Sequence, residues 1–138
     1  MKKHLIVFSA ALVLGSGGLA LAGQPGRDAI LQHYKQQAGD KAAGGFSAAR
    51  GKAFFLARHS GGKPATPSCT VCHTSSPRNT GKTRAGKAIK PMAVSKTPDR
   101  FTNAKKVAKW FRRNCRSVLG RKCTPMEKGD YITFMISQ

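Results

Sequence analysis

Four segments of the chain carry apolar residues at the spacing of an α-helix. They are residues 27–38, residues 48–58, a segment that begins after Thr102 or Asn103, and a segment that opens at Pro125. The apolar positions that define them are Ile30, Leu31, Tyr34, Phe54, Phe55, Val107, Trp110, Phe111, Tyr131, Ile132, Met135 and Ile136. No strand-like alternation and no internal repeat stands out, so the pattern predicts a small all-α fold.

Residues with strong capping preferences mark the ends of these predicted helices. Gly39 ends the first helix, and Ser47 can cap the second, which places Gly51 and Phe55 on one face. The last helix opens on Thr124-Pro125-Met126-Glu127, a capping box with proline at the first helical position. The local sequence and the hydrophobic pattern therefore agree on where these helices begin and end.

A long stretch with little periodicity separates the second predicted helix from the third. Residues 59–68 are rich in glycine and proline, and residues 74–96 are polar and basic. A long structureless loop is unusual in a small domain unless something else organises it. Because the helices also supply few large apolar side chains, we expect part of the core to come from a group that the chain does not encode.

The N-terminus has the layout of a secretory signal peptide. The pair Lys2-Lys3 precedes an apolar run over residues 5–14, and small residues then end at Ala20-Leu21-Ala22, an A-x-A cleavage pattern. The apolar run is too short for a lasting membrane span, and an uncleaved anchor is the alternative. We therefore expect residues 1–22 to be removed, leaving residues 23–138 as one exported, periplasmic domain without a membrane span.

The composition is strongly basic, with 25 Lys and Arg against 5 Asp and Glu and a formal net charge of +20. Such a charge indicates an anionic partner, which is nucleic acid, lipid headgroups or an acidic protein. Export argues against nucleic acid and places the 4 cysteines in an oxidising compartment. We therefore expect the basic surface to dock an acidic protein, with an acidic glycan or headgroup surface as the alternative.

The motif Cys69-Thr70-Val71-Cys72-His73 is C-x-x-C-H, the attachment signature of c-type haem. Two thiols at this spacing add to the two vinyl groups of one porphyrin edge, and the next residue becomes the proximal imidazole of the iron. A redox pair would need a βαβ pattern, and a zinc site would need a second C-x-x-C or paired histidines, neither of which is seen. A local disulfide would leave His73 unused. The motif therefore predicts one covalent haem c.

Two further cysteines, Cys115 and Cys123, remain once the haem has taken its pair. An even remainder in an oxidising compartment suggests one disulfide. It would close a short loop, turning at Gly120, between the last two predicted helices. The alternative is a pair of buried free thiols.

The second axial position of the iron decides between an electron carrier and a gas-binding protein. The candidate ligands are His33, His59, Met92, Asn114, Met126 and Met135. Met92 can reach around a haem edge from His73, but a loop methionine can equally pack on the porphyrin. Asn114 shares the predicted helix face of Trp110 and Phe111, where a buried amide needs a polar partner, and its alternative role is capping. The last helix's methionines are expected in the core and both histidines at the surface.

Several motifs together resemble the family of the sphaeroides haem protein and cytochrome c-double-prime. The motifs span nearly all of the chain after residue 22 and are Phe54-Phe55-Leu56, Gly61-Gly62-Lys63-Pro64, Pro67-Ser68-Cys69-Thr70, Cys72-His73, Thr97-Pro98-Asp99-Arg100-Phe101-Thr102, Asn114-Cys115, Gly120-Arg121 and Cys123-Thr124-Pro125. The resemblance implies a class I cytochrome c-like monohaem fold with long loops and a Cys115–Cys123 disulfide. In this family the residue before the first disulfide cysteine is the distal ligand, either asparagine or histidine. The resemblance therefore implies Asn114 as the distal ligand.

The same resemblance implies electron transfer coupled to the binding of small ligands. Asn114 is expected to bind ferric iron, to leave on reduction, and to open a site for O2, NO or CO, where its amide can donate a hydrogen bond. We expect this role rather than turnover as an enzyme, with an acidic redox partner such as a dihaem cytochrome c. The alternative is a plain electron-transfer cytochrome that uses His73 and Met92.

Overall fold

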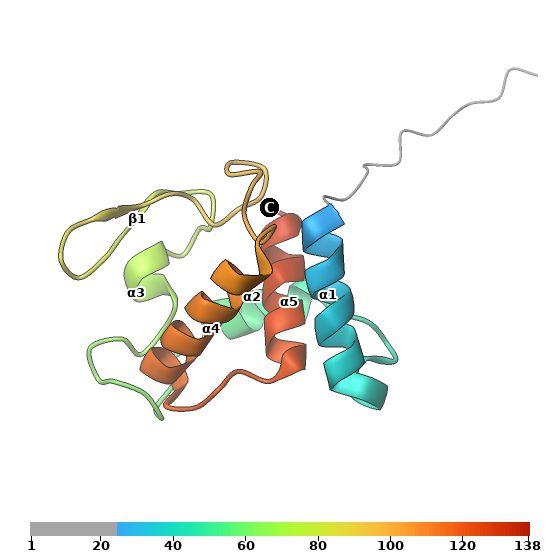
Figure 1. Ribbon diagram of the computed structural model, residues 1–138. Coiled ribbons are helices and arrows are strands. Elements are labelled where there is room, and N and C mark those ends of the chain that lie inside the picture. Colours follow the sequence, from blue (N-terminus) through green and yellow to red (C-terminus); the bar gives the residue numbers. More distant parts are fainter. Residues whose placement is uncertain (1–24) are drawn as a thin grey trace, which may run out of the picture.

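A computed structural model describes residues 25–138 of the chain, so the expected signal peptide at residues 1–22 lies outside the described residues. The described part consists mainly of helices joined by long loops, and it contains one small hairpin (Figure 1). The elements in chain order are α1 (Pro25–Ala38), η1 (Gly39–Ala42), α2 (Ala48–Leu56), α3 (Thr70–His73), β1 (Gly81–Lys82), β2 (Ala88–Ile89), α4 (Ala104–Leu119) and α5 (Pro125–Ile136). The predicted all-α class with long loops is confirmed.

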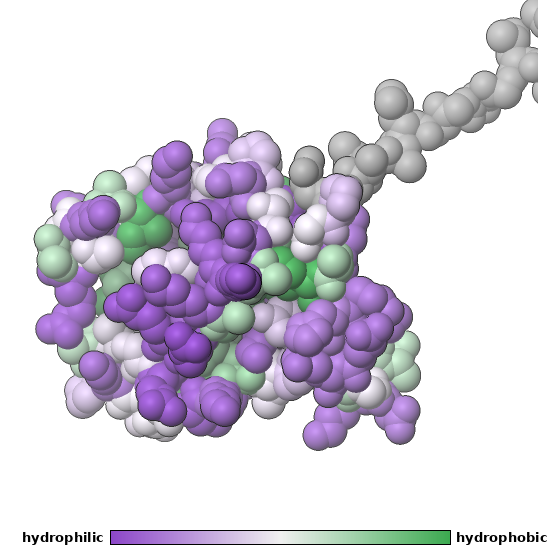
Figure 2. All heavy atoms as spheres, in the orientation of Figure 1, coloured by the Kyte–Doolittle hydropathy of each residue, from purple (hydrophilic) through white to green (hydrophobic). Residues whose placement is uncertain are grey.

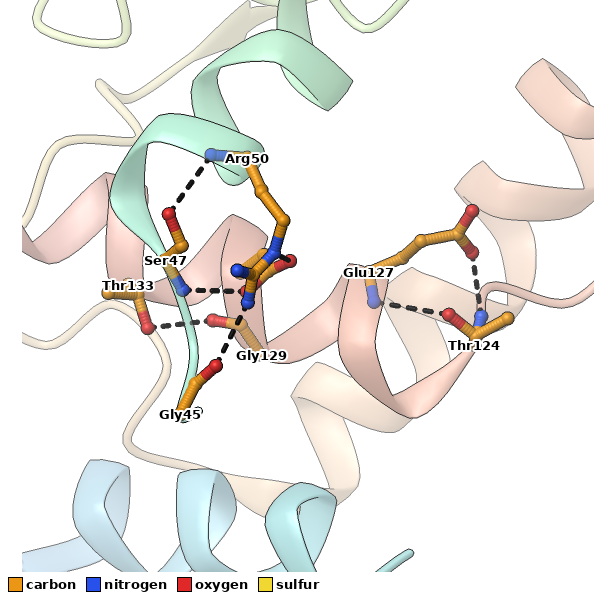
Figure 3. Close-up of polar contacts among 8 residues, drawn as sticks. Gly45, Ser47, Arg50, Thr124, Glu127, Gly129 and Thr133 are labelled. Carbon is orange, nitrogen blue, oxygen red and sulfur yellow. Dashed lines mark hydrogen bonds and ion pairs between the residues drawn. The ribbon is translucent and has the colours of Figure 1, made fainter. Parts of the chain in front are cut away.

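Side-chain caps fix the starts of three of these helices. The Ser47 hydroxyl accepts a hydrogen bond of 3.3 Å from the backbone of α2, and Asn103 rather than Thr102 accepts one of 2.9 Å from the backbone of α4. Thr124 and Glu127 form the predicted capping box at the start of α5, with reciprocal bonds of 3.2 and 2.7 Å (Figure 3). These bonds satisfy amide groups that the first helical turn leaves without partners.

Two helix boundaries differ from the prediction. The first helix begins at Pro25 rather than residue 27, because proline has the backbone angle of a first helical turn and needs no amide partner there. The second ends at Leu56 rather than at residue 58, because Ala57 is extended, with ψ of 147°. Neither difference moves an apolar face.

The core is built around α5, which packs against α1 and α2 (Figure 1). Ile132 and Met135 of α5 and Phe55 of α2 have no measurable exposure. Ile136, which the helical spacing grouped with these residues, is 40% exposed because the helix ends there at the surface. The core face of α5 therefore stops one residue before Ile136.

An ion pair between the exposed Arg50 of α2 and the buried Asp130 of α5 ties the two helices together (Figure 3). Asp130, which is 5% exposed, accepts bonds of 2.7 and 2.9 Å from the Arg50 guanidinium. The same carboxylate accepts a bond of 2.7 Å from the backbone N–H of Ser47. Every oxygen of this buried carboxylate is thus hydrogen-bonded, which is the condition under which a buried charge is tolerated.

Two short strands correct the expectation that the chain would show none. Gly81 pairs with Ile89 and Lys82 with Ala88 in an antiparallel hairpin. Strands of two residues cannot produce a detectable alternation in the sequence, so pattern reasoning has no access to them. This hairpin lies beside α3, on the side of the molecule opposite α1 (Figure 1).

Arginine side chains organise the long loop between α3 and α4. Arg27 of α1 is 5% exposed and donates to the carbonyls of Pro98, at 2.6 Å, and Arg100, at 3.0 and 3.1 Å. Arg100 in turn donates to the carbonyl of Pro91 at 3.1 Å, which Thr97 also reaches at 2.9 Å. The loop is therefore held in place by side-chain bonds to its own carbonyl groups.

Candidate functional site

The C-x-x-C-H motif folds into one turn of helix. His73 N–H donates to the carbonyl of Cys69 at 3.1 Å, and Thr74 N–H donates to Thr70 at 3.0 Å. Residues at i, i+3 and i+4 lie on the same side of a helix, so Cys69, Cys72 and His73 share one face of α3. Both thiols are free. The turn thus presents two thiols and an imidazole together.

Burial sets the protonation states of Cys69 and His73. Desolvation raises the pKa of the Cys69 thiol to about 11, so it remains protonated at neutral pH. Burial, together with the positive charge of Arg100, lowers the pKa of His73 to about 4. The imidazole is therefore neutral at physiological pH, and neutral imidazole is the form that binds metals.

The hairpin packs directly on this helical turn. A Cβ at position 81 would overlap the carbonyl oxygen of Cys72, so only glycine fits there without a shift of the backbone. Gly81 thereby lets the start of the hairpin close against α3. This requirement could not be predicted, because nothing nearby in the chain distinguishes Gly81 from the other loop glycines.

Several aromatic and sulfur-containing side chains bring α3, the long loop, α4 and α5 into one apolar cluster. Cys69, Met92, Phe101 and Phe111 are partly buried and pack against the main core. The ring of Tyr131 in α5 meets Phe101 and Phe111 edge to face, with centroids 6.1 and 5.6 Å away. Met92 therefore belongs to the same cluster as Cys69.

Three backbone hydrogen bonds hold the part of the long loop that carries Met92. The N–H groups of Met92 and Ala93 both donate to the carbonyl of Pro77, at 2.8 and 2.9 Å. Val94 N–H donates to the carbonyl of Met135 in α5 at 2.9 Å. The loop that carries Met92 is thus fastened on one side to the segment after α3 and on the other to α5.

Asn114 lies on α4 one turn after Trp110, as the helical spacing predicted, but its side chain is exposed rather than buried. The core-facing stripe of the helix runs through buried Val107, partly buried Phe111 and buried Cys115, at intervals of four residues. Trp110 and Asn114 lie one position before two of these residues, at the edge of the stripe, and both are exposed. The Asn114 amide is therefore exposed and not buried as expected, because the buried stripe is narrower than i, i+3, i+4 spacing suggests.

A disulfide between Cys115 and Cys123 fixes the turn that follows Asn114. The two Cα atoms are 5.5 Å apart, and each cysteine is 5% exposed. Gly120, at φ of 71°, provides the left-handed residue that ends α4 between them. The pairing predicted from the sequence is confirmed, and it anchors the end of α4 to the start of α5.

The other candidate ligands lie elsewhere. His33 is exposed beside Tyr34, and the His59 ring nitrogen lies 3.3 Å from the carbonyl of Phe54. Met135 is fully buried in the core, and Met126 is partly buried at the start of α5. The structure thus brings Cys69, Cys72 and His73 together, and Met92 packs in the same apolar cluster as Cys69.

The side chains around α3 fit a c-type haem. Two free thiols and a neutral imidazole on one turn are the attachment chemistry that this cofactor requires. Trp110, a large apolar side chain one helical turn before Asn114, is 46% exposed. Within residues 25–138, no three His, Cys, Asp or Glu side chains are grouped so that they could hold a metal ion by themselves.

None of the helices in residues 25–138 has the length and apolar character needed to cross a membrane.

Comparison with known sequences identifies the relatives of this chain. Residues 41–135 match a family described as a domain of unknown function, DUF1924. The chain is 46% identical over 135 residues to the cytochrome c-type protein SHP of Cereibacter sphaeroides, a match that covers 98% of both proteins. It is 35% identical over 89 residues to cytochrome c'' of Methylophilus methylotrophus, covering 64% of this chain and 62% of that protein.

Solved structures show the same similarity. Oxidised SHP, described as an oxygen-binding cytochrome c, superposes with a TM-score of 0.73 at 47% identity, covering 81% of this chain and 96% of that one. Oxidised cytochrome c'' of Methylophilus methylotrophus superposes with a TM-score of 0.69 at 28% identity, covering 83% and 95%. A solution structure of cytochrome c'', which concerns haem-ligand detachment, gives a TM-score of 0.68, also at 28% identity, covering 83% and 94%.

Proposed function

The chain belongs to the c-type cytochrome family of SHP and cytochrome c'', whose members carry covalent haem, and we propose that Cys69 and Cys72 attach one haem c and that His73 ligates its iron. The observation that carries this proposal is the single turn of α3, which presents two free thiols and a neutral imidazole on one face. The hairpin, held against this turn through Gly81, keeps it in place.

Asn114 is the proposed distal ligand. It stands directly before the Cys115–Cys123 disulfide, which holds its backbone, while its exposed amide is free to turn. Bound haem supplies an iron that changes oxidation state and has a position for a small ligand. A neutral amide is a weak ligand, so Asn114 would hold the iron only loosely, and once released its N–H could donate a hydrogen bond to a small ligand such as O2, NO or CO. The oxygen binding of SHP and the ligand detachment studied in cytochrome c'' support this assignment.

A plain electron-transfer cytochrome with Met92 as the distal ligand is the second candidate. The observation that favours it is the packing of Met92 in the same cluster as Cys69. Thioether sulfur is a common iron ligand in cytochromes c and raises the reduction potential.

Two single substitutions separate these candidates. Asn114→Ala should convert the ferric optical and EPR spectra to those of a protein that has lost its distal side-chain ligand, because alanine offers no donor atom. Met92→Leu, a change of similar size in the apolar cluster, should leave the ferric spectrum unchanged. The reverse pattern would establish the His/Met cytochrome instead.

The basic surface is proposed to dock an acidic redox partner, such as a dihaem cytochrome c. Six exposed cations lie along α4, and hydrophilic side chains cover this part of the molecule (Figure 2). They are Lys105, Lys106, Lys109, Arg112, Arg113 and Arg116. Complementary charge steers the encounter of redox proteins and mainly affects the association rate.

Steering of this kind is sensitive to salt. We expect the second-order rate of reduction by an acidic dihaem cytochrome c, measured by stopped flow, to fall steeply as ionic strength rises from about 0.01 to about 0.15 M, because the Debye length shortens from about 30 to about 8 Å. A rate that does not change over this range would exclude electrostatic docking.

Export is proposed on the strength of residues 1–22. Haem attachment to Cys69 and Cys72 would then take place in the periplasm. N-terminal sequencing of the mature protein tests this, since cleavage after Ala22 leaves Gly23 as the first residue and retention of Met1 would contradict it.

A further inference from the structure

A pocket of about 340 Å³ opens at the C-terminal half of α4, where the loop after α2 meets the helix. It is lined by Lys63, Arg113, Asn114, Arg116 and Ser117. We propose that this pocket is a binding site for a small oxyanion, such as nitrate or inorganic phosphate. Its walls offer three cations and an amide, all of which can donate hydrogen bonds to an anion.

Hydrogen bonds between the loop and the helix build this pocket. Lys63 N–H donates to the carbonyl of Ser117 at 2.7 Å, and the Thr66 hydroxyl lies 2.9 Å from the Ser117 hydroxyl. Gly62 presses its backbone against Ser117 and Val118 so closely that a Cβ would overlap their atoms. The position of Lys63 relative to α4 is therefore set by the backbone before any ligand arrives.

The carbonyl groups at the end of a helix would ordinarily repel an anion. In this pocket the carbonyl of Ser117 already accepts two hydrogen bonds, from Lys63 N–H at 2.7 Å and from the Thr66 hydroxyl at 3.2 Å. That oxygen is thus partly neutralised. The Thr66 hydroxyl has a single hydrogen, so the Ser117 hydroxyl donates to it in the 2.9 Å contact, and the donors left for an anion are the three cations and the Asn114 amide.

The cations of the pocket have no acidic partner in the part of the chain that the structure describes. The ion pairs found there are Arg50–Asp130 and Arg121–Glu127, and neither involves a pocket residue. Arg113 and Arg116 are three residues apart on one helix, where like charges repel each other. An oxyanion between them would remove this repulsion without breaking an existing ion pair, and guanidinium groups bind oxyanions through paired N–H donors.

Arg113 is also held in a defined orientation. Its guanidinium carbon lies 5.2 Å from the centre of the Trp110 ring, a cation–π contact one helical turn before the pocket. A side chain already stacked in this way loses less conformational freedom when it binds a ligand.

The pocket shares Asn114 with the proposed distal site. An oxyanion here would accept a hydrogen bond from the amide that is proposed to ligate iron. Binding of the anion would therefore change the affinity of Asn114 for the iron. This link rests on the proposed function, whereas the oxyanion site itself rests only on the pocket and its cations.

An NMR titration of the complete holoprotein tests the proposal. Nitrate and phosphate are added separately to the reduced, CO-saturated protein at constant ionic strength, and the backbone amides of Lys63 and Ser117 are followed. We expect saturable, single-site shifts with at least one of the two anions. Arg113→Gln should weaken this binding about tenfold or more, because it removes a charge-assisted hydrogen bond.

Arg112→Gln is the matched control, since it removes the same charge from the adjacent exposed residue, which does not line the pocket. It should change the affinity by no more than about twofold, in line with the small effect of a screened surface charge. Equal weakening by the two variants, or shifts that never saturate, would overturn the proposal. The reduced protein under CO is diamagnetic whether it binds CO or keeps a methionine ligand, so this result is independent of the distal ligand.

Discussion

Replacing both Cys69 and Cys72 by alanine should leave the chain without covalently attached haem. Both thiols lie on the face of α3 that carries His73, and no other free cysteine is found in residues 25–138. Thioether bonds survive denaturation, whereas a haem held only by axial ligands is lost. We therefore expect the variant to show no haem-dependent peroxidase stain on a denaturing gel, and the intact mass to equal that of the bare polypeptide.

The double substitution Cys115→Ala and Cys123→Ala is the control for this result, because it also removes two sulfurs. This variant should keep its haem on the denaturing gel. It should unfold more readily, by about 2–3 kcal/mol on chain-entropy estimates for a short closed loop. A haem stain that disappears in the second variant and persists in the first would reverse the assignment of the two cysteine pairs.

Replacing Ile132 by alanine should produce the largest loss of stability among the single changes considered. Ile132 has no measurable exposure and lies in the cluster that joins α5 to α2. Deleting a buried side chain of this size removes its transfer free energy and leaves a cavity, which costs about 2–5 kcal/mol. Denaturant unfolding of the holoprotein, followed by far-UV circular dichroism, measures the change.

Ile136 offers a control on the same helix with the same residue type. It is 40% exposed, so Ile136→Ala should cost under about 1 kcal/mol. Similar losses in the two variants would mean that α5 is not packed as described, and that its buried face extends to the C-terminal end of the helix.

The helices and their caps were predictable because they depend on local sequence. Ser47 and the box of Thr124 and Glu127 act on backbone groups within three residues, so each signal lies next to the structure that it determines. The same holds for the α3 turn, whose motif specifies its own spacing. The hairpin at Gly81 was missed because its strands are two residues long and its position depends on contact with Cys72.

Long-range contacts account for the rest of what the sequence did not reveal. Arg27 holds the carbonyls of Pro98 and Arg100, more than 70 positions along the chain, and looks in the sequence like any surface arginine. The exposure of Asn114 could not be read from its helical spacing, because the width of a buried stripe is set by the neighbouring helices. Lys63 and Arg113 share a pocket only because the loop after α2 folds back on α4.

The optical spectrum of the reduced protein, before and after the addition of CO, tests the central proposal most directly. If Asn114 leaves the iron on reduction, the ferrous spectrum is high-spin and changes fully to that of a CO complex at about one equivalent of the gas. A low-spin ferrous spectrum of the methionine-ligated type that CO does not alter would contradict the account and assign the distal position to Met92.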